Sequence, residues 1–415
     1  MKRWRILAAI ITVLGFAVAN VYYWHSVVTP KETRLKFHQS YVAARNDMSK
    51  SIEDMEGAIG TLDTLNTKHL TRCEHITVHN IKAQYRRSID KKSSKITATS
   101  HAMQRRAERY LGYTPTLAEL RDIGEIEFAE VQAKLNRLQQ RLVDQGSDKT
   151  LHDIAMRPAA RTDDPSRVTE VYDALIRRAE RDLRGQFYDY GLPSGVAKAS
   201  DAPHRWSAPA SYQRKDNTLI AYPNDGVFNL DVAAFISVHE IFPGHHLDLK
   251  NDKDSKLCDD FSTRSGFTYL LEGWVTYTEF VADEEGFFDA PEHKLAWLDY
   301  RLIRAMRILL DVERAEMGLT DKTHLQKVWQ GRMPPRLWGY FEREYARLTA
   351  SQHQHLGYLL GYQAIMDAKK NLQADLGERF DHRAFHDALL RLDHRELGAL
   401  YDTLKIAMDM TGEDS

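Results

Sequence analysis

Apolar side chains recur at spacings of three and four residues along most of this 415-residue chain. This spacing places them on one face of a helix, so it predicts amphipathic helices. Between residues 117 and 143 the apolar positions are Leu120, Ile123, Ile126, Phe128, Val131, Leu135, Leu138 and Leu142. The same pattern predicts helices over residues 165–190, 267–283, 293–316, 324–330, 336–350 and 355–376, with a final pair over 381–409. We therefore predict a mostly α-helical fold.

One stretch, residues 191–223, interrupts the helical pattern with four prolines. Within it, residues 218–222 (Thr-Leu-Ile-Ala-Tyr) predict a short strand. The fold would then contain at most a short β-edge, shortly before residues 239–246. An exposed strand edge in that position could pair with the extended backbone of a peptide substrate.

The most informative motif lies at residues 239–246, which read His-Glu-Ile-Phe-Pro-Gly-His-His. A zinc hydrolase uses two neutral imidazoles to bind the metal and an adjacent carboxylate, here Glu240, as the general base toward water. In the usual His-Glu-x-x-His spacing both imidazoles lie on one helix face, whereas here the second histidine comes two residues later. Pro243 lacks an N–H and clashes with the carbonyl of His239, and Gly244 tolerates almost any backbone angle, so we predict a break in the helix.

The break decides which histidine can join His239. In an unbroken helix His246 would share the face of His239 but lie roughly 10 Å further along the axis, too far for one metal ion. We therefore predict that His245 is the second ligand and keep His246 as the alternative.

A second motif supplies acidic partners. Residues 270–279 read Leu-Leu-Glu-Gly-Trp-Val-Thr-Tyr-Thr-Glu, so Glu272 and Glu279 are seven residues apart and share one helix face. One carboxylate can complete the coordination of a single zinc ion, while the other orients a ligand histidine from behind.

Together, these motifs resemble the bacterial family called domain of unknown function 885, which is similar to helical zinc peptidases of the gluzincin type. The resemblance covers about residues 110–367. It implies that His239, His245 and Glu272 bind the metal and that Glu240 is the general base. It also implies that Tyr358 steadies an oxyanion, and it leaves Glu279 and His246 to support the ligands.

The chain also departs from that family pattern. Residues 311–315 (Asp-Val-Glu-Arg-Ala) lack the Gly and His of an Asp-x-Gly-x-His pattern, and residues 352–359 are altered around Gln354. We predict an extracytoplasmic zinc metallopeptidase with a peptide substrate. The alternative is a non-catalytic, membrane-anchored helical binding protein derived from such a peptidase.

The first residues predict where the protein resides. Lys2, Arg3 and Arg5 precede an apolar run at residues 6–18, which is typical of a targeting segment. Because residues 21–24 extend the run toward the length of a membrane span, we predict that 1–24 is an anchor in the inner membrane. The alternative is a signal peptide cleaved after Ala19, which would give a secreted protein. A helical region over 25–110 and a metallopeptidase-like domain over 111–415 would face the periplasm or exterior.

Charge and cysteine content restrict the remaining possibilities. The formal net charge is −2, which argues against a dedicated nucleic-acid partner. Cys73 and Cys258 could pair in an oxidising compartment, and the sequence leaves this open.

Overall fold

The computed structural model describes residues 115–204, 208–250, 268–317, 321–350, 355–391, 397 and 400–411, and parts of the chain between residues 32 and 111. The chain divides into two compact units, residues 1–95 with 257–263 and residues 96–256 with 264–415. The predicted anchor at residues 1–24 lies outside the described residues. Among the residues that are described, no helix has both the length and the apolar character needed to cross a membrane.

The first unit contains helix α3 (Ile52–Asp63), which begins with a capping box between Ser51 and Asp54. This arrangement satisfies two backbone N–H groups at the start of the helix. Its buried core consists of Met55, Leu62, Leu65, Val78, Ile81 and Tyr85. Cys73 is disulfide-bonded; the other cysteine, Cys258, lies outside the described residues.

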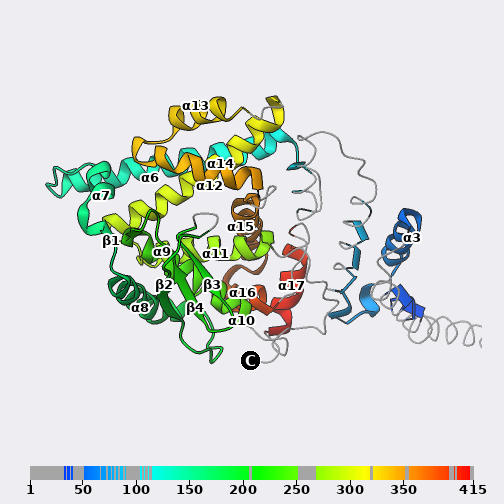
Figure 1. Ribbon diagram of the computed structural model, residues 1–415. Coiled ribbons are helices and arrows are strands. Elements are labelled where there is room, and N and C mark those ends of the chain that lie inside the picture. The colour runs from blue at the N-terminus through cyan, green and yellow to red at the C-terminus, as the bar shows by residue number, and fades with distance from the viewer. Residues whose placement is uncertain are drawn as a thin grey trace, which may run out of the picture. The chain divides into compact units, whose positions relative to one another are not determined.

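The second unit is built mainly from helices, which confirms the predicted mostly α-helical fold (Figure 1). Its helices are α6 (Leu117–Asp144), α7 (Leu151–Met156), α8 (Pro165–Asp182), α9 (Ala233–Glu240), α10 (His245–Lys250), α11 (Thr268–Glu284), α12 (Pro291–Met317), α13 (Lys322–Arg332), α14 (Phe341–Ala350), α15 (Leu356–Leu376), α16 (His382–Arg391) and α17 (Leu400–Thr411). Two predicted helices are shorter than expected. Helix α8 ends at Asp182 before a 3₁₀ turn, and residues 335–340 form a 3₁₀ segment ahead of α14.

Residues 191–223 form three strands where the sequence predicted one. They are β2 (Val196–Ala199), β3 (Ala210–Gln213) and β4 (Thr218–Ala221), in the order β2-β4-β3. Strand β4 is the predicted strand, but it lies in the centre, parallel to β2 and antiparallel to β3. The expectation that it forms the free edge is therefore wrong: β2 and β3 are the outer strands of this sheet, and β3 is the one that packs against α9. Separately, β1 (Arg161–Thr162) pairs with β5 (Phe228–Asn229).

Two glycines bring α11 and α15 close together. A Cβ atom on Gly361 would lie 2.0 Å from the carbonyl oxygen of Tyr269, and one on Gly273 would lie 2.4 Å from the backbone of Gly361. Only residues without a side chain allow this approach. The contact places the first turn of α15 beside the part of α11 that carries Glu272.

Helix α12 is buried along most of its length and carries three buried arginines. Each forms a two-bond ion pair with a carboxylate on a different helix. The pairs are Arg301 with Glu127 on α6, Arg304 with Glu279 on α11, and Arg307 with Glu344 on α14. These pairs satisfy charges that would be costly to bury alone.

Candidate metal centre

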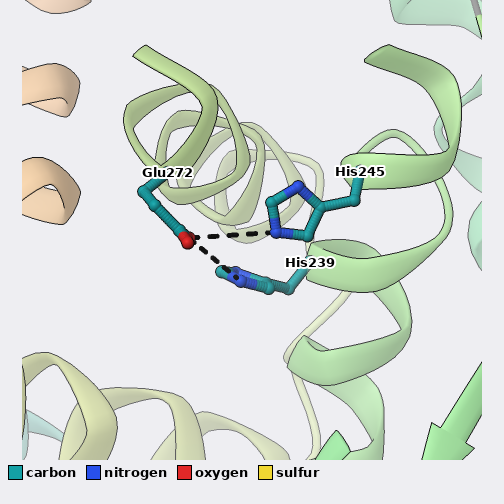
Figure 2. Close-up of side chains that lie close together, drawn as sticks. All are labelled: His239, His245 and Glu272. Carbon is teal, nitrogen blue, oxygen red and sulfur yellow. Dashed lines mark ion pairs between the residues drawn. The ribbon is translucent and has the colours of Figure 1, made fainter. Parts of the chain in front are cut away.

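Three side chains from separate helices meet in the interior of the second unit (Figure 2). Both His239 and His245 approach Glu272, with each Nε2 atom 3.8 Å from Glu272 Oε2. One ligand atom from each residue lies within 4.8 Å of the others. Metal–ligand bonds of roughly 2 Å require ligand atoms at about this mutual separation. The arrangement can therefore hold one metal ion.

The break between α9 and α10 makes this meeting possible. Helix α9 ends at Glu240, and α10 starts again at His245 after a turn through Pro243 and Gly244. A Cβ atom on Gly244 would lie 1.9 Å from the carbonyl oxygen of His239, so no larger residue fits. Trp274 on α11 donates its indole N–H to the Pro243 carbonyl at 3.0 Å and holds the turn against that helix. As a result, the His239 and His245 rings contact each other, with centroids 5.1 Å apart.

A fixed set of partners orients His239. Its Nδ1 lies 2.8 Å from Oε1 of Glu279, which leaves Nε2 facing Glu272. Glu279 is fully buried and also accepts from Trp297 Nε1 at 3.0 Å and from Arg304 at 2.6 and 2.7 Å. Burial disfavours the ionised form of Glu279, but the interactions with Arg304 and His239 are stronger and lower its pKa to about 2. This ionised carboxylate is the kind of partner that orients metal-ligating histidines.

The other two residues have buried atoms that suit a cation. Glu272 Oε2, the atom that faces both histidines, is buried without a hydrogen-bond partner among the described residues. Burial holds the pKa of His245 well below its usual value, so the ring is neutral, which is the form that binds metal. Burial also raises the pKa of Glu272, and the opposing effects of His239, Arg347, Arg304 and the Tyr358 hydroxyl offset this only in part. A bound cation would supply the missing interaction, so the residues present fit a metal.

The structure places His246 away from this cluster. Its Nδ1 lies 2.8 Å from the Tyr212 hydroxyl and its Nε2 lies 2.8 Å from the Pro193 carbonyl oxygen. Because the carbonyl can only accept, Nε2 carries the proton and Nδ1 accepts from the tyrosine. Both nitrogens are thus engaged, and these contacts tie His246 on α10 to β3 and to Pro193.

Glu240 lies at the end of α9, directly after His239. Burial raises the pKa of Glu240 to about 7, and Glu272 adds to this shift, whereas His239 and the Tyr212 backbone N–H oppose it. That N–H donates to the Glu240 carboxylate and fixes it at the edge of β3. A carboxyl group with a pKa near neutrality can both accept and release a proton at physiological pH.

Tyr358 lies in the first turn of α15, beside the cluster. Its ring stacks near that of His239, with centroids 6.3 Å apart, and its hydroxyl donates to Glu272. The guanidinium groups of Arg304 and Arg307 lie 5.0 and 5.8 Å from the centre of the same ring. Tyr358 is therefore held at the candidate site, with its hydroxyl facing a ligand carboxylate.

Sequence reasoning brought together His239, Glu240, His245, Glu272, Glu279 and Tyr358, and the structure places all six in one region. It missed Trp297, Arg304 and Tyr212, which fix the positions of Glu279 and Glu240. A signal for Arg304 exists in the sequence, since three arginines recur every three residues on an otherwise apolar helix face. Nothing comparable marks the backbone N–H of Tyr212.

The fold and site define a mostly α-helical protein with two histidines and a carboxylate gathered in its interior. The chain belongs to the family of bacterial proteins of unknown function called DUF885, whose model matches residues 27–395.

Solved structures share this fold. One is the "putative lipoprotein" from Colwellia psychrerythraea, with a TM-score of 0.62 and 18% identity over 88% of this chain and 70% of that chain. Another such protein, of unknown function, comes from Shewanella oneidensis, with a TM-score of 0.58 and 16% identity over 87% of this chain and 72% of that chain. The comparison with curated proteins finds no match.

Proposed function

We propose that this protein is a zinc-dependent peptidase. The observation that carries the proposal is the meeting of His239, His245 and Glu272 around a space suited to one ion, with Glu240 beside them. Two histidines and one carboxylate are a ligand set typical of catalytic zinc, which keeps a position open for water or substrate. A zinc ion bound there would supply Lewis acidity toward water and toward a peptide carbonyl.

The protein's own residues divide the remaining work. Glu240 accepts a proton from the attacking water and later donates it to the leaving amine, which its pKa of about 7 permits. Tyr358 turns its hydroxyl from Glu272 to the oxyanion that forms on the substrate carbonyl. Glu279 and Arg304 keep the His239 ring in place during these steps.

The edge of β3 offers a place for a peptide substrate. Tyr222 N–H donates to the Pro209 carbonyl, and the register pairs Ser211 with Ile220 and Tyr212 with Leu219. By the alternation of antiparallel pairs, the backbone groups of Tyr212 face away from β4. Since Tyr212 N–H donates to the Glu240 carboxylate, an extended peptide along this edge would pass beside Glu240 and could pair with the Tyr212 carbonyl.

The site would work outside the cytoplasm. The charged and apolar pattern of residues 1–24 is that of an exported protein. The lipoprotein designation of the two structural relatives agrees with this location.

A metal analysis and a peptide-pool digest test the proposal. We expect about one zinc per chain and hydrolysis of a mixed peptide pool by the wild-type protein. Glu240→Gln should keep the metal and lose roughly a hundredfold to ten-thousandfold in rate. Glu170→Gln, an exposed carboxylate on α8, is the control and should change neither. Metal without hydrolysis would favour the non-catalytic binding protein, and a metal-free wild type would overturn both.

A further inference from the structure

A cavity of about 390 Å³ opens at the beginning of β3. Ala208 and Pro209, which lead into β3, line one side of it, and residues 222–225, which follow β4, line another. None of the three proposed metal ligands lines this cavity, so it is separate from the metal centre.

The wall of the cavity carries excess positive charge. Three arginines line it, whereas Asp225 is the one acidic residue among the lining side chains. Arg336 is already paired with Asp299, at 2.6 and 2.9 Å. Within the described part of the chain, Arg161 and Arg343 form no ion pair. Arg161 donates only to the carbonyl oxygens of Ala160 and Ala155, each at 3.4 Å, and Arg343 lies over the ring of Tyr340 at 4.1 Å. Neither guanidinium group is paired with a carboxylate, and arginine is well suited to bind carboxylates.

Strand β3 connects the cavity to the proposed catalytic region. The residues that lead into β3, Ala208 and Pro209, line the cavity, and β3 packs against α9, the helix that carries His239 and ends at Glu240. A peptide that lies along β3 would therefore reach both the cavity and Glu240.

The direction of β3 shows which end of a peptide would reach it. Antiparallel pairing is the more stable arrangement, and it runs the peptide from Tyr212 toward Ala210 in its N-to-C direction. The C-terminal side of the peptide then leads to Pro209 and Ala208, at the cavity wall. At 3.3–3.4 Å per residue, Pro209 lies roughly 10 Å along the strand from Tyr212, about three residues beyond the bond at Glu240.

We propose that this cavity binds a substrate carboxylate through Arg343 and Arg161, and that its source is the C-terminus of a peptide. The inference rests on the proposed peptidase function for the position of the cleaved bond. It implies that the protein removes short fragments of about three residues from peptide C-termini.

Peptide binding to the Glu240→Gln protein tests this, because that variant should hold a peptide without cleaving it. The probes are an N-terminally labelled alanine hexapeptide with a free C-terminus, its C-terminal amide, and an amide with one glutamate near the C-terminus. Affinity is measured by fluorescence anisotropy. We expect the free acid to bind about tenfold to a hundredfold more tightly than the amide, as for one hydrogen bond to a charged group. Arg343→Gln and Arg161→Gln should each reduce this difference, and Arg137→Gln, an exposed arginine on α6, should preserve it.

The three peptides and the arginine variants distinguish the possible outcomes. If the glutamate-bearing amide binds as tightly as the free acid and loses that advantage in Arg343→Gln, the cavity binds side-chain carboxylates, and its assignment to the peptide C-terminus is overturned. Equal affinity for all three peptides, no measurable binding, or a preference that both arginine variants leave intact would overturn the inference. Wild-type hydrolysis without a carboxylate preference would leave the peptidase proposal standing. A carboxylate preference without hydrolysis would leave the cavity site standing and remove the peptidase.

Discussion

Replacing Glu279 by glutamine should weaken both metal binding and the stability of the fold. In the native structure this fully buried carboxylate accepts from His239, from Trp297 and twice from Arg304. Glutamine keeps the size but has one acceptor oxygen and no charge. Arg304 would then remain buried without its counter-charge, and His239 would lose the ionised partner that fixes its ring.

The expected magnitudes follow from these contacts. Breaking a buried ion pair by removing one partner costs about 3–5 kcal/mol of unfolding free energy. Loss of the carboxylate behind a ligand histidine lowers metal affinity by roughly tenfold to a hundredfold. The variant should therefore unfold at lower urea concentration and release zinc more readily to a chromophoric chelator.

The chain provides a matched control on the same helix. Arg301 and Glu127 form a similar buried pair, at 2.6 and 2.9 Å, that does not touch the metal ligands. Glu127→Gln should destabilise the fold, by less than Glu279→Gln because Arg301 keeps Glu130 at 3.1 Å, while leaving metal affinity unchanged. If both variants lose metal affinity equally, or if Glu279→Gln binds metal as tightly as the wild type, the positioning role of Glu279 is refuted.

Further predictions concern the adjacent His245 and His246 and the buried His386. His245→Ala should abolish zinc binding. His246→Ala should keep the zinc but lower stability, because His246 is bonded to Tyr212 and Pro193. Metal analysis showing the reverse would contradict the ligand assignment. Burial lowers the pKa of His386 to about 3. Below about pH 6.5 this histidine is therefore protonated in the unfolded chain but stays neutral in the folded chain, so the free energy of unfolding falls as the pH drops. The loss should reach about 2 kcal/mol at pH 5 and should be missing in His386→Asn, and equal slopes of unfolding free energy against pH in both proteins would disprove it.

Local sequence was enough to predict most of the helices and the unusual turn. Helix α6 begins where Thr116 and Glu119 form a capping box and continues through the predicted apolar stripe, because both signals depend only on neighbouring residues. The break after Glu240 was likewise predicted from Pro243 and Gly244, which act on their own backbone. Residues 191–223 were less predictable, since strands of four residues between prolines carry little periodic signal.

The composition of the site depended on contacts between distant segments. The sequence could place Glu272 and Glu279 on one helix face, but it could not decide from spacing which one faces the histidines. That choice follows from how α11 packs: Gly273 against Gly361 turns Glu272 toward His239 and His245, and Arg304 and Trp297 enclose Glu279. The sequence favoured His245 over His246 from helix geometry, but the partners of His246, Tyr212 and Pro193, are contacts that only the tertiary structure provides. The cavity beside β3 is also a tertiary feature, because Arg161 and Arg343 lie far apart in the chain and meet only when the helices and strands are assembled.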